Sequence, residues 1–327
     1  MNYTAIITGI TGQDGAYLSK FLLNKGYTII GLTRSHNNFN KSNLQHLNIL
    51  NNIQIEECDL LDFSSIVKIL DKYAPDEIYN LAAQSSVGLS FEQPIGTISY
   101  NTISVLNILE SIRILDLHTK FYQASSSEMY GKVAELPVKE DTLLHPLSPY
   151  AISKASAFWI VTNYRESYNI FGVNGILFNH ESYLRPRNYF VKKVITTALE
   201  ISRGKTDSLR VGNIDIKRDY GYAPDYVEAM WMSLQHKTPD DYIICSGTSV
   251  CLRDIIYYVF EKFKISKNRI IENPDLYRPA EIENLYGNNE KAKKVLGWYY
   301  SKSFFDVLDI LIEEEIRNYS NENSNRS

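Results

Sequence analysis

A glycine-rich turn between an apolar strand and a helix does most to constrain how this chain can fold. Residues Ala5–Thr8 predict a short strand, and apolar side chains recur at helical spacing over Tyr17–Leu23. Between them, Gly9 allows a tight turn, Gly12 lets the backbone approach a pyrophosphate, and Gly15 lets helix and strand pack closely. Backbone N–H groups at the helix start then bind phosphates. The order predicts a dinucleotide-binding unit; the alternative is a glycine-rich turn without a ligand.

The second predicted strand indicates which dinucleotide binds. This strand, Thr28–Leu32, leads to Arg34, at a place where NAD-binding proteins usually carry an acidic residue for the ribose 2′-hydroxyl. A guanidinium stays charged and can bind two oxygens of a 2′-phosphate. We therefore predict NADP as the cofactor, with NAD as the less favoured alternative and a plain surface arginine as the other interpretation.

Strands and helices continue to alternate after this point. Ile53–Glu56 and Glu77–Leu81 predict strands, and Ile66–Leu70 lies on the helix between them. This alternation predicts an α/β fold with a doubly wound parallel sheet of the Rossmann type, whose strand ends face a cofactor crevice. The residues expected to line that crevice are Gly9, Thr11, Gly12, Gln13, Asp14, Gly15, Arg34, Asp59, Leu60, Leu81, Ala82, Ala83, Ser85 and Tyr100.

The next strand and helix carry the candidate catalytic residues. A strand at Lys120–Ala124 precedes Ser126 and Glu128, and a helix opens with Tyr150 and Lys154, which are one helical turn apart. A free tyrosine has a pKa of about 10, and a nearby ammonium favours the phenolate, so the tyrosine can take a proton from a substrate hydroxyl. The serine would hold the same hydroxyl while a hydride passes to the nicotinamide. These residues predict an oxidoreductase core.

Several longer motifs are spread along the chain. They are Ile7-Thr-Gly-Ile-Thr-Gly-Gln-Asp-Gly15, Ile78-Tyr-Asn-Leu-Ala-Ala-Gln-Ser85, Tyr122-Gln-Ala-Ser-Ser-Ser-Glu-Met-Tyr-Gly131, Asn163-Tyr-Arg-Glu-Ser-Tyr168, Asn174-Gly-Ile-Leu-Phe-Asn-His-Glu-Ser182 and Arg218-Asp219. Together these motifs resemble one family, the GDP-mannose 4,6-dehydratases of the extended short-chain dehydrogenase superfamily. The Gly-x-x-Gly-x-x-Gly spacing is typical of that superfamily, and the resemblance spans nearly the whole chain.

The resemblance implies a reaction and a role for each catalytic residue. Members of the family oxidise C4 of a hexose, eliminate water across C5 and C6, and return the hydride to C6. The resemblance makes Tyr150 the base for C4 oxidation, and Glu128 the group that removes the C5 proton and helps the C6 hydroxyl leave. Epimerases of the superfamily typically lack an acid at the position of Glu128. Further positions carry over as cofactor contacts, His180 and Arg185, or as nucleotide-sugar contacts, Ser85, Asn179, Lys193, Arg218, Arg278 and Glu281.

The sequence also departs from the family pattern. Ser126 replaces the usual threonine but keeps the hydroxyl. The segment Tyr183–Arg187 replaces an Arg-Arg-Gly-Glu loop and is one residue longer; in the family that loop supports the neighbouring subunit's cofactor site and the tetramer. Asn101, Thr102, Ser86 and Gly88 differ near the cofactor and sugar.

These departures leave several substrates and functions open. GDP-mannose is the expected substrate, with GDP-N-acetylglucosamine or a GDP-heptose as alternatives. A nucleotide-sugar epimerase or C4 dehydrogenase would use the same core without losing water. A non-catalytic NADP-binding regulator would have no reason to keep all of the catalytic side chains, so it ranks last.

The second half of the chain predicts a smaller domain. Residues 1–175 are expected to form the NADP-binding domain, with later segments returning to it, and residues 176–319 a mixed α/β domain for the nucleotide sugar. Residues 320–327 are polar and expected to be disordered. Helices near Tyr100–Leu115 and Tyr150–Tyr168 predict a homodimer at least, with a tetramer possible.

Composition excludes other classes of protein and site. The net charge is −4 and no block of Lys or Arg is dense enough to follow a nucleic-acid backbone. The N-terminus lacks a signal peptide and no long apolar run follows, so we expect a cytoplasmic protein without membrane contact. Neither the odd number of cysteines nor the scattered histidines predicts a metal site: Cys58, Cys245 and Cys251 are far from any Cys-x-x-Cys spacing.

Overall fold

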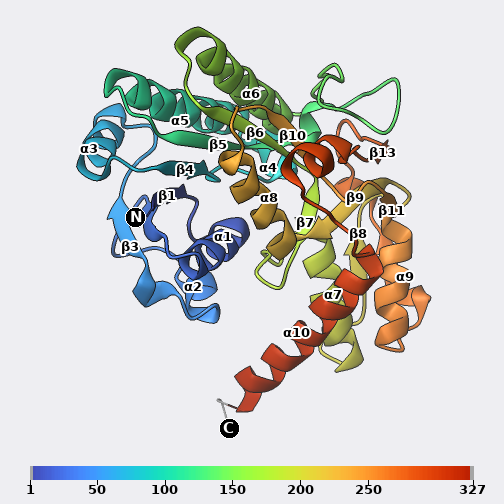
Figure 1. The fold of residues 1–327 in the computed structure, drawn as a ribbon. Helices are drawn as coiled ribbons and strands as arrows, with labels where there is room; N and C mark the ends of the chain where they lie inside the picture. The colour runs from blue at the N-terminus through green and yellow to red at the C-terminus, as the bar shows by residue number, and fades with distance from the viewer. Residues whose placement is uncertain (1–2, 325–327) are drawn as a thin grey trace.

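A seven-stranded sheet forms the centre of the computed structural model, which describes residues 3–324 (Figure 1). The strand order is β10-β6-β5-β4-β1-β2-β3, and every neighbouring pair is parallel. The order reverses between β1 and β4, which opens a crevice at the carboxyl ends of these strands. The strands are β1 (Thr4–Thr8), β2 (Thr28–Thr33), β3 (Gln54–Glu57), β4 (Glu77–Asn80), β5 (Lys120–Ser126), β6 (Gly172–Leu177) and β10 (Asp241–Ile244).

Helices cover both faces of this sheet, as a buried parallel sheet requires. One face carries α1 (Gln13–Asn24), the short α2 (Ser42–His46) and α8 (Ala223–Gln235). The other face carries α3 (Phe63–Tyr73), α5 (Pro94–Ile114) and α6 (Pro149–Tyr168), and the short α4 (Val87–Glu92) precedes α5. The prediction of a doubly wound α/β fold is therefore confirmed.

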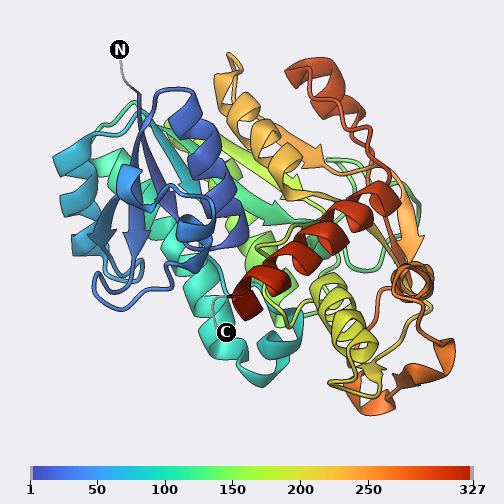
Figure 2. The same ribbon diagram turned by 90° about the horizontal axis from the view of Figure 1, so that it is seen from below.

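The C-terminal half builds a second, smaller core beside the sheet (Figure 2). Its helices are α7 (Phe190–Ser202), α9 (Leu252–Lys262) and α10 (Phe304–Ser324). Two small sheets accompany them, formed by β8 (Leu209–Val211) with β12 (Ile270–Glu272), and by β7 (Asn179–Glu181), β9 (Lys217–Tyr222), β11 (Ser249–Cys251) and β13 (Asn284–Leu285).

The two halves are not continuous segments of the chain. The expected boundary after residue 175 falls inside β6, and α8 and β10 return to the large sheet from the second half. Helix α10 runs to Ser324, into the segment expected to be disordered, while residues 325–327 lie outside the described part of the chain. Helix α5 starts at Pro94, before the expected Tyr100, because proline suits a first helical turn. Within residues 3–324, no helix is both long and apolar enough to cross a bilayer.

The glycine turn allows α1 to lie close to β1. Gly9 has φ +68°, a left-handed conformation that glycine adopts without strain, and its Cα faces the backbone of Ala82. A Cβ at Gly9 would lie 2.9 Å from the Ala82 nitrogen, and a Cβ at Gly15 would overlap the Gly9 carbonyl oxygen. The turn therefore has space only for glycines at these positions.

Replacing Gly15 with alanine tests this packing. The added methyl group would meet backbone atoms of Gly9 and Ile10, which cannot rotate away. We expect Gly15→Ala to lower the free energy of unfolding by about 1–3 kcal/mol in chemical denaturation. Gly96→Ala is the matched control, because Gly96 is exposed on α5 and its added Cβ would have no atom within 4 Å. The control should be neutral or slightly stabilising; wild-type stability of Gly15→Ala would contradict the close packing.

Candidate active site

The start of α6 places Tyr150 and Lys154 at the carboxyl end of β5. Ser148 caps the helix by accepting a hydrogen bond from the Ala151 N–H at 3.1 Å, and a proline occupies the first turn. The Lys154 ammonium donates to the carbonyl oxygen of Ala124 at 2.7 Å. Both Tyr150 and Lys154 are buried, so the pair faces the sheet rather than solvent.

Ser126 and Glu128 come from the end of β5 itself. Ser126 is the last residue of the strand, and its hydroxyl accepts a 3.3 Å hydrogen bond from the Glu128 N–H as a short 3-10 helix begins. Both residues line a cavity of about 490 Å³ together with Tyr150 and Lys154. The structure thus brings the predicted catalytic side chains into this one cavity, the catalytic cavity.

Burial dominates the electrostatics of this group. Burial raises the pKa of Tyr150 well above its ordinary value, the Ser126 hydrogen bond lowers it, and the charge of Glu128 raises it. Burial also lowers the pKa of Lys154 to about 8, against a smaller raising effect of Asp14. Burial is thus the largest influence on the pKa of both groups, because loss of water penalises the charged form of each.

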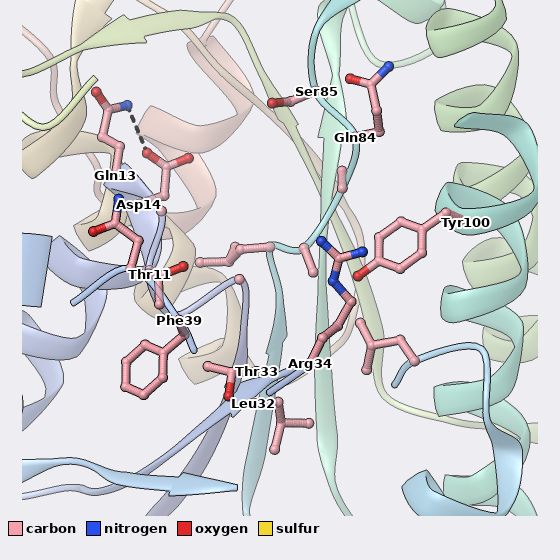
Figure 3. Close-up of a pocket in the computed structure, with 18 of the residues that line it drawn as sticks. Thr11, Gln13, Asp14, Leu32, Thr33, Arg34, Phe39, Gln84, Ser85 and Tyr100 are labelled. Carbon is pink, nitrogen blue, oxygen red and sulfur yellow. Dashed lines mark hydrogen bonds between the residues drawn. The ribbon is translucent and has the colours of Figure 1, made fainter. Parts of the chain in front are cut away.

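A second cavity, of about 840 Å³, lies along the glycine turn (Figure 3). Gly12 is the N-cap of α1 and provides no side-chain cap, so the first N–H groups of this helix remain open to a phosphate. Figure 3 shows Arg34 beside the hydroxyl end of Tyr100, across the cavity from Thr11. Burial raises the pKa of Tyr100, and the charge of Arg34 opposes this rise.

Most residues predicted for the cofactor line one of the two cavities. The cavity along the glycine turn includes Gly9, Thr11, Gly12, Gln13, Asp14, Gly15, Arg34, Leu60, Leu81, Ala82, Ala83, Ser85, Tyr100 and Arg185. Tyr150, Lys154 and His180 line the catalytic cavity instead. Asp59 lines neither, and its carboxylate accepts a hydrogen bond from the Leu61 N–H.

The glycine turn and these side chains fit a dinucleotide. The turn leaves a cradle that a Cβ would fill, an uncapped helix start faces it, and the Arg34 guanidinium lies across the cavity from Thr11. Phosphates, a ribose and an additional 2′-phosphate need these donors. Among residues 3–324, there is no group of three or more His, Cys, Asp or Glu side chains arranged to hold a metal ion.

A buried polar network ties the glycine turn to β7. His180 contacts the carbonyl of Phe178 through Nδ1 at 2.7 Å and the carboxylate of Asp14 through Nε2 at 2.9 Å. Both partners are acceptors, so the imidazolium, which donates from both nitrogens, suits this position. Burial acts to lower the pKa of His180, but Asp14 outweighs it and raises the pKa. The Gln13 amide donates to the His180 carbonyl and accepts from the Ser182 hydroxyl.

The catalytic cavity is lined by cations on the side of the smaller domain. Of the predicted nucleotide-sugar contacts, Asn179, Lys193, Arg218 and Arg278 line it. Arg278 lies 3.8 Å from the Glu128 carboxylate. Glu281 is not part of the lining; its carboxylate lies 3.2 Å from the Arg218 guanidinium.

Sequence reasoning missed some lining residues. Gln84 and Thr97 line the glycine-turn cavity and bond each other at 3.0 Å, and Tyr189 lines both cavities. Gln84 lies within the motif that ends at Ser85, between two predicted cofactor residues, so its position in that motif is a signal for a cavity residue. Tyr189 stands in an irregular loop before α7, where no periodicity or spacing marks it.

Comparison with known proteins agrees with this geometry. The chain matches the family model described as GDP-mannose 4,6 dehydratase over residues 6–311. It is 42% identical over 323 residues to GDP-mannose 4,6 dehydratase 2 of Arabidopsis thaliana, covering 95% of this chain and 86% of the relative.

Solved structures share the fold at lower identity. A dTDP-glucose 4,6-dehydratase from Streptomyces venezuelae, with NAD and TYD bound, has a TM-score of 0.87 at 18% identity, covering 97% of this chain and 98% of that one. UDP-glucose 4-epimerase from Thermotoga maritima, with UDP-glucose, has a TM-score of 0.86 at 23% identity, covering 97% and 99%. These likenesses show the fold alone, whereas the match in sequence is specific: the chain belongs to the GDP-mannose 4,6-dehydratase family.

Proposed function

We propose that the protein is an NADP-dependent 4,6-dehydratase that converts GDP-mannose to GDP-4-keto-6-deoxymannose. Membership of the family supports the reaction, and the observation that carries it is Glu128 in one cavity with Ser126, Tyr150 and Lys154. An oxidoreductase core needs a base for the hydroxyl proton. Elimination of water needs a further acid–base group, and Glu128 supplies it.

Each side chain has a defined task in this proposal. Tyr150 takes the proton of the C4 hydroxyl, which Ser126 holds by a hydrogen bond, and Lys154 supports the charge that develops on the phenol. A nicotinamide cofactor held by the glycine-turn cavity would supply the hydride chemistry, removal of a hydride from C4 and its return to C6. A ketone at C4 acidifies the C5 hydrogen, so Glu128 removes this proton next and passes a proton to the departing C6 hydroxyl. Return of the hydride to C6 then needs a proton at C5, and Tyr150 holds the one that it took from the C4 hydroxyl.

The cations of the smaller domain suit the diphosphate. Burial lowers the pKa of Arg218, and Glu128 opposes this effect, so the guanidinium is a desolvated charge beside the catalytic carboxylate. Arg278 and Lys193 line the same cavity. Guanidinium groups bind phosphate oxygens through paired N–H donors. Their presence in the lining favours binding of an anionic group in the catalytic cavity.

Substitution of Glu128 tests the elimination step. We expect Glu128→Gln to lower formation of dehydrated product by at least about 10²-fold, because the amide cannot take the C5 proton. Oxidation at C4, followed by cofactor absorbance in a single turnover, should persist. Tyr150→Phe is the matched comparison and should lose oxidation itself. Full dehydration by Glu128→Gln, measured as loss of one water by mass spectrometry, would refute the assignment.

The same mass assay separates the alternatives for substrate and reaction. GDP-N-acetylglucosamine and a GDP-heptose would each lose one water if the sugar pocket accepts them. An epimerase would return a product of unchanged mass, and a C4 dehydrogenase would consume added NADP in proportion to product. GDP-mannose is the preferred substrate because the sequence relatives carry that name.

Arg34 supports the preference for NADP over NAD. Its guanidinium lies at the end of the glycine-turn cavity beside Tyr100, and no acidic residue follows β2 directly. We expect Arg34→Ala to weaken NADP binding about tenfold while leaving NAD binding nearly unchanged. Arg210→Ala, an exposed arginine on β8, is the control. Calorimetry showing equal losses for both dinucleotides would contradict recognition of the 2′-phosphate.

The exposed faces of α5 and α6 favour a homodimer at least. Ile103 on α5 is 40% exposed, and Ile152 and Trp159 on α6 are 43% and 59% exposed. Large apolar side chains on neighbouring helices suit a second copy of the chain. We expect Trp159→Glu to shift the protein to a monomer, measured as molar mass by light scattering. A wild-type monomer would refute the dimer.

A further inference from the structure

The two cavities of the site share a wall that contains an unusual pair of hydroxyl groups. The hydroxyls of Ser85 and Tyr189 lie 2.6 Å apart, and both residues line both cavities. Ser85 follows β4 in the large sheet, whereas Tyr189 precedes α7 in the smaller domain. Figure 3 shows Ser85 at the end of the glycine-turn cavity remote from Leu32. The pair therefore joins the two halves of the chain where the cavities meet.

Arg185 packs against the ring of Tyr189, and Glu181 in turn lies close to Arg185. The guanidinium carbon of Arg185 lies 3.9 Å from the ring centroid, as in a stacked cation–π contact. The Arg185 Nε in turn lies 3.7 Å from the carboxylate of Glu181, which is 3% exposed. This series of contacts fixes the ring and thereby the place of its hydroxyl.

Stabilisation of the fold does not explain the hydroxyl pair. Ser85 is exposed and Tyr189 is half-buried, so water could replace either partner at little cost. Each hydroxyl offers one donor and two acceptor positions, and their mutual bond uses one of each. The pair keeps one O–H donor and free lone pairs, which is what neighbouring hydroxyls of a sugar ring require. Tyr189 and Tyr150 also line the same cavity.

We propose that Tyr189 is a substrate-positioning residue, whose hydroxyl acts with that of Ser85 as one unit to bind the hexose and hold it against Tyr150. This inference rests on the proposed function, because it requires a nucleotide sugar in the catalytic cavity. It also places part of the sugar site on the loop that carries Tyr189. The loop follows the segment Tyr183–Arg187, where the sequence departs from the family pattern.

A double-mutant cycle tests the proposal by equilibrium binding. Tyr189→Phe, Ser85→Ala and their combination are made in a Tyr150→Phe background, in which the ligand is not turned over. Binding of GDP-mannose to the NADP-saturated proteins is measured by calorimetry. We expect each single change to weaken binding about tenfold and the combination to weaken it no further, because either change already breaks the pair. Unchanged binding by Tyr189→Phe, or additive losses, would overturn the proposal.

Controls separate a positioning role from a structural one. Tyr189→Phe keeps the ring on Arg185, so its melting temperature and its affinity for NADP should equal those of the parent. Tyr299→Phe removes a hydroxyl from a tyrosine that is 70% exposed and should leave GDP-mannose binding unchanged. Weaker NADP binding with unchanged GDP-mannose binding would assign the pair to the cofactor and overturn the proposal.

The proposed function is judged separately in the same set of proteins. The chain with Tyr150 intact is assayed for loss of water from GDP-mannose. If it forms no dehydrated product while the parent of the cycle still binds GDP-mannose, the proposed reaction is wrong and the cycle still decides the role of Tyr189. If the parent binds no GDP-mannose, both proposals are overturned.

Discussion

The hydrogen bond from Lys154 to the carbonyl oxygen of Ala124 joins the first turn of α6 to the carboxyl end of β5, and the geometry of the site depends on it. The helix contributes the tyrosine and lysine, and the strand contributes Ser126 and Glu128 immediately beyond the bonded carbonyl. A buried ammonium without such a partner would be too costly to keep. Even with it, burial lowers the lysine pKa to about 8.

A second set of contacts sets the position of the smaller domain relative to the glycine turn. Gln13 and Asp14, at the start of α1, bond His180 on β7, and Ser182 bonds Gln13. The same helix start lines the glycine-turn cavity, so the network that binds the halves together also lies beside that cavity. Hydride transfer needs two ligands in contact, and this arrangement makes the two cavities share a wall.

Two arginine–glutamate pairs lie in or beside the catalytic cavity. Arg278 lies 3.8 Å from Glu128, and Arg218 lies 3.2 Å from Glu281. These separations are longer than those of tight charge-assisted hydrogen bonds. Arg218 also donates through Nη1 to the carbonyl oxygens of Lys217 and Ile282. Arg278 is 37% exposed and keeps the more accessible donors for a diphosphate, while Glu128 stays close to the end of β5. In the proposed reaction, the smaller domain supplies charge for binding, and the large sheet supplies the groups that react.

The sequence by itself determined the doubly wound core, the glycine turn and the pairing of Tyr150 with Lys154, because each depends on local spacing: alternation of elements, the absence of a Cβ, and one helical turn. Tertiary structure alone decided which predicted residues face the cavities, for Asp59 turns to a backbone N–H of its own loop and Glu281 lies against an arginine. It also revealed Tyr189 and raised the Tyr150 pKa. Side-chain direction and burial arise from contacts between distant segments, which no local pattern encodes.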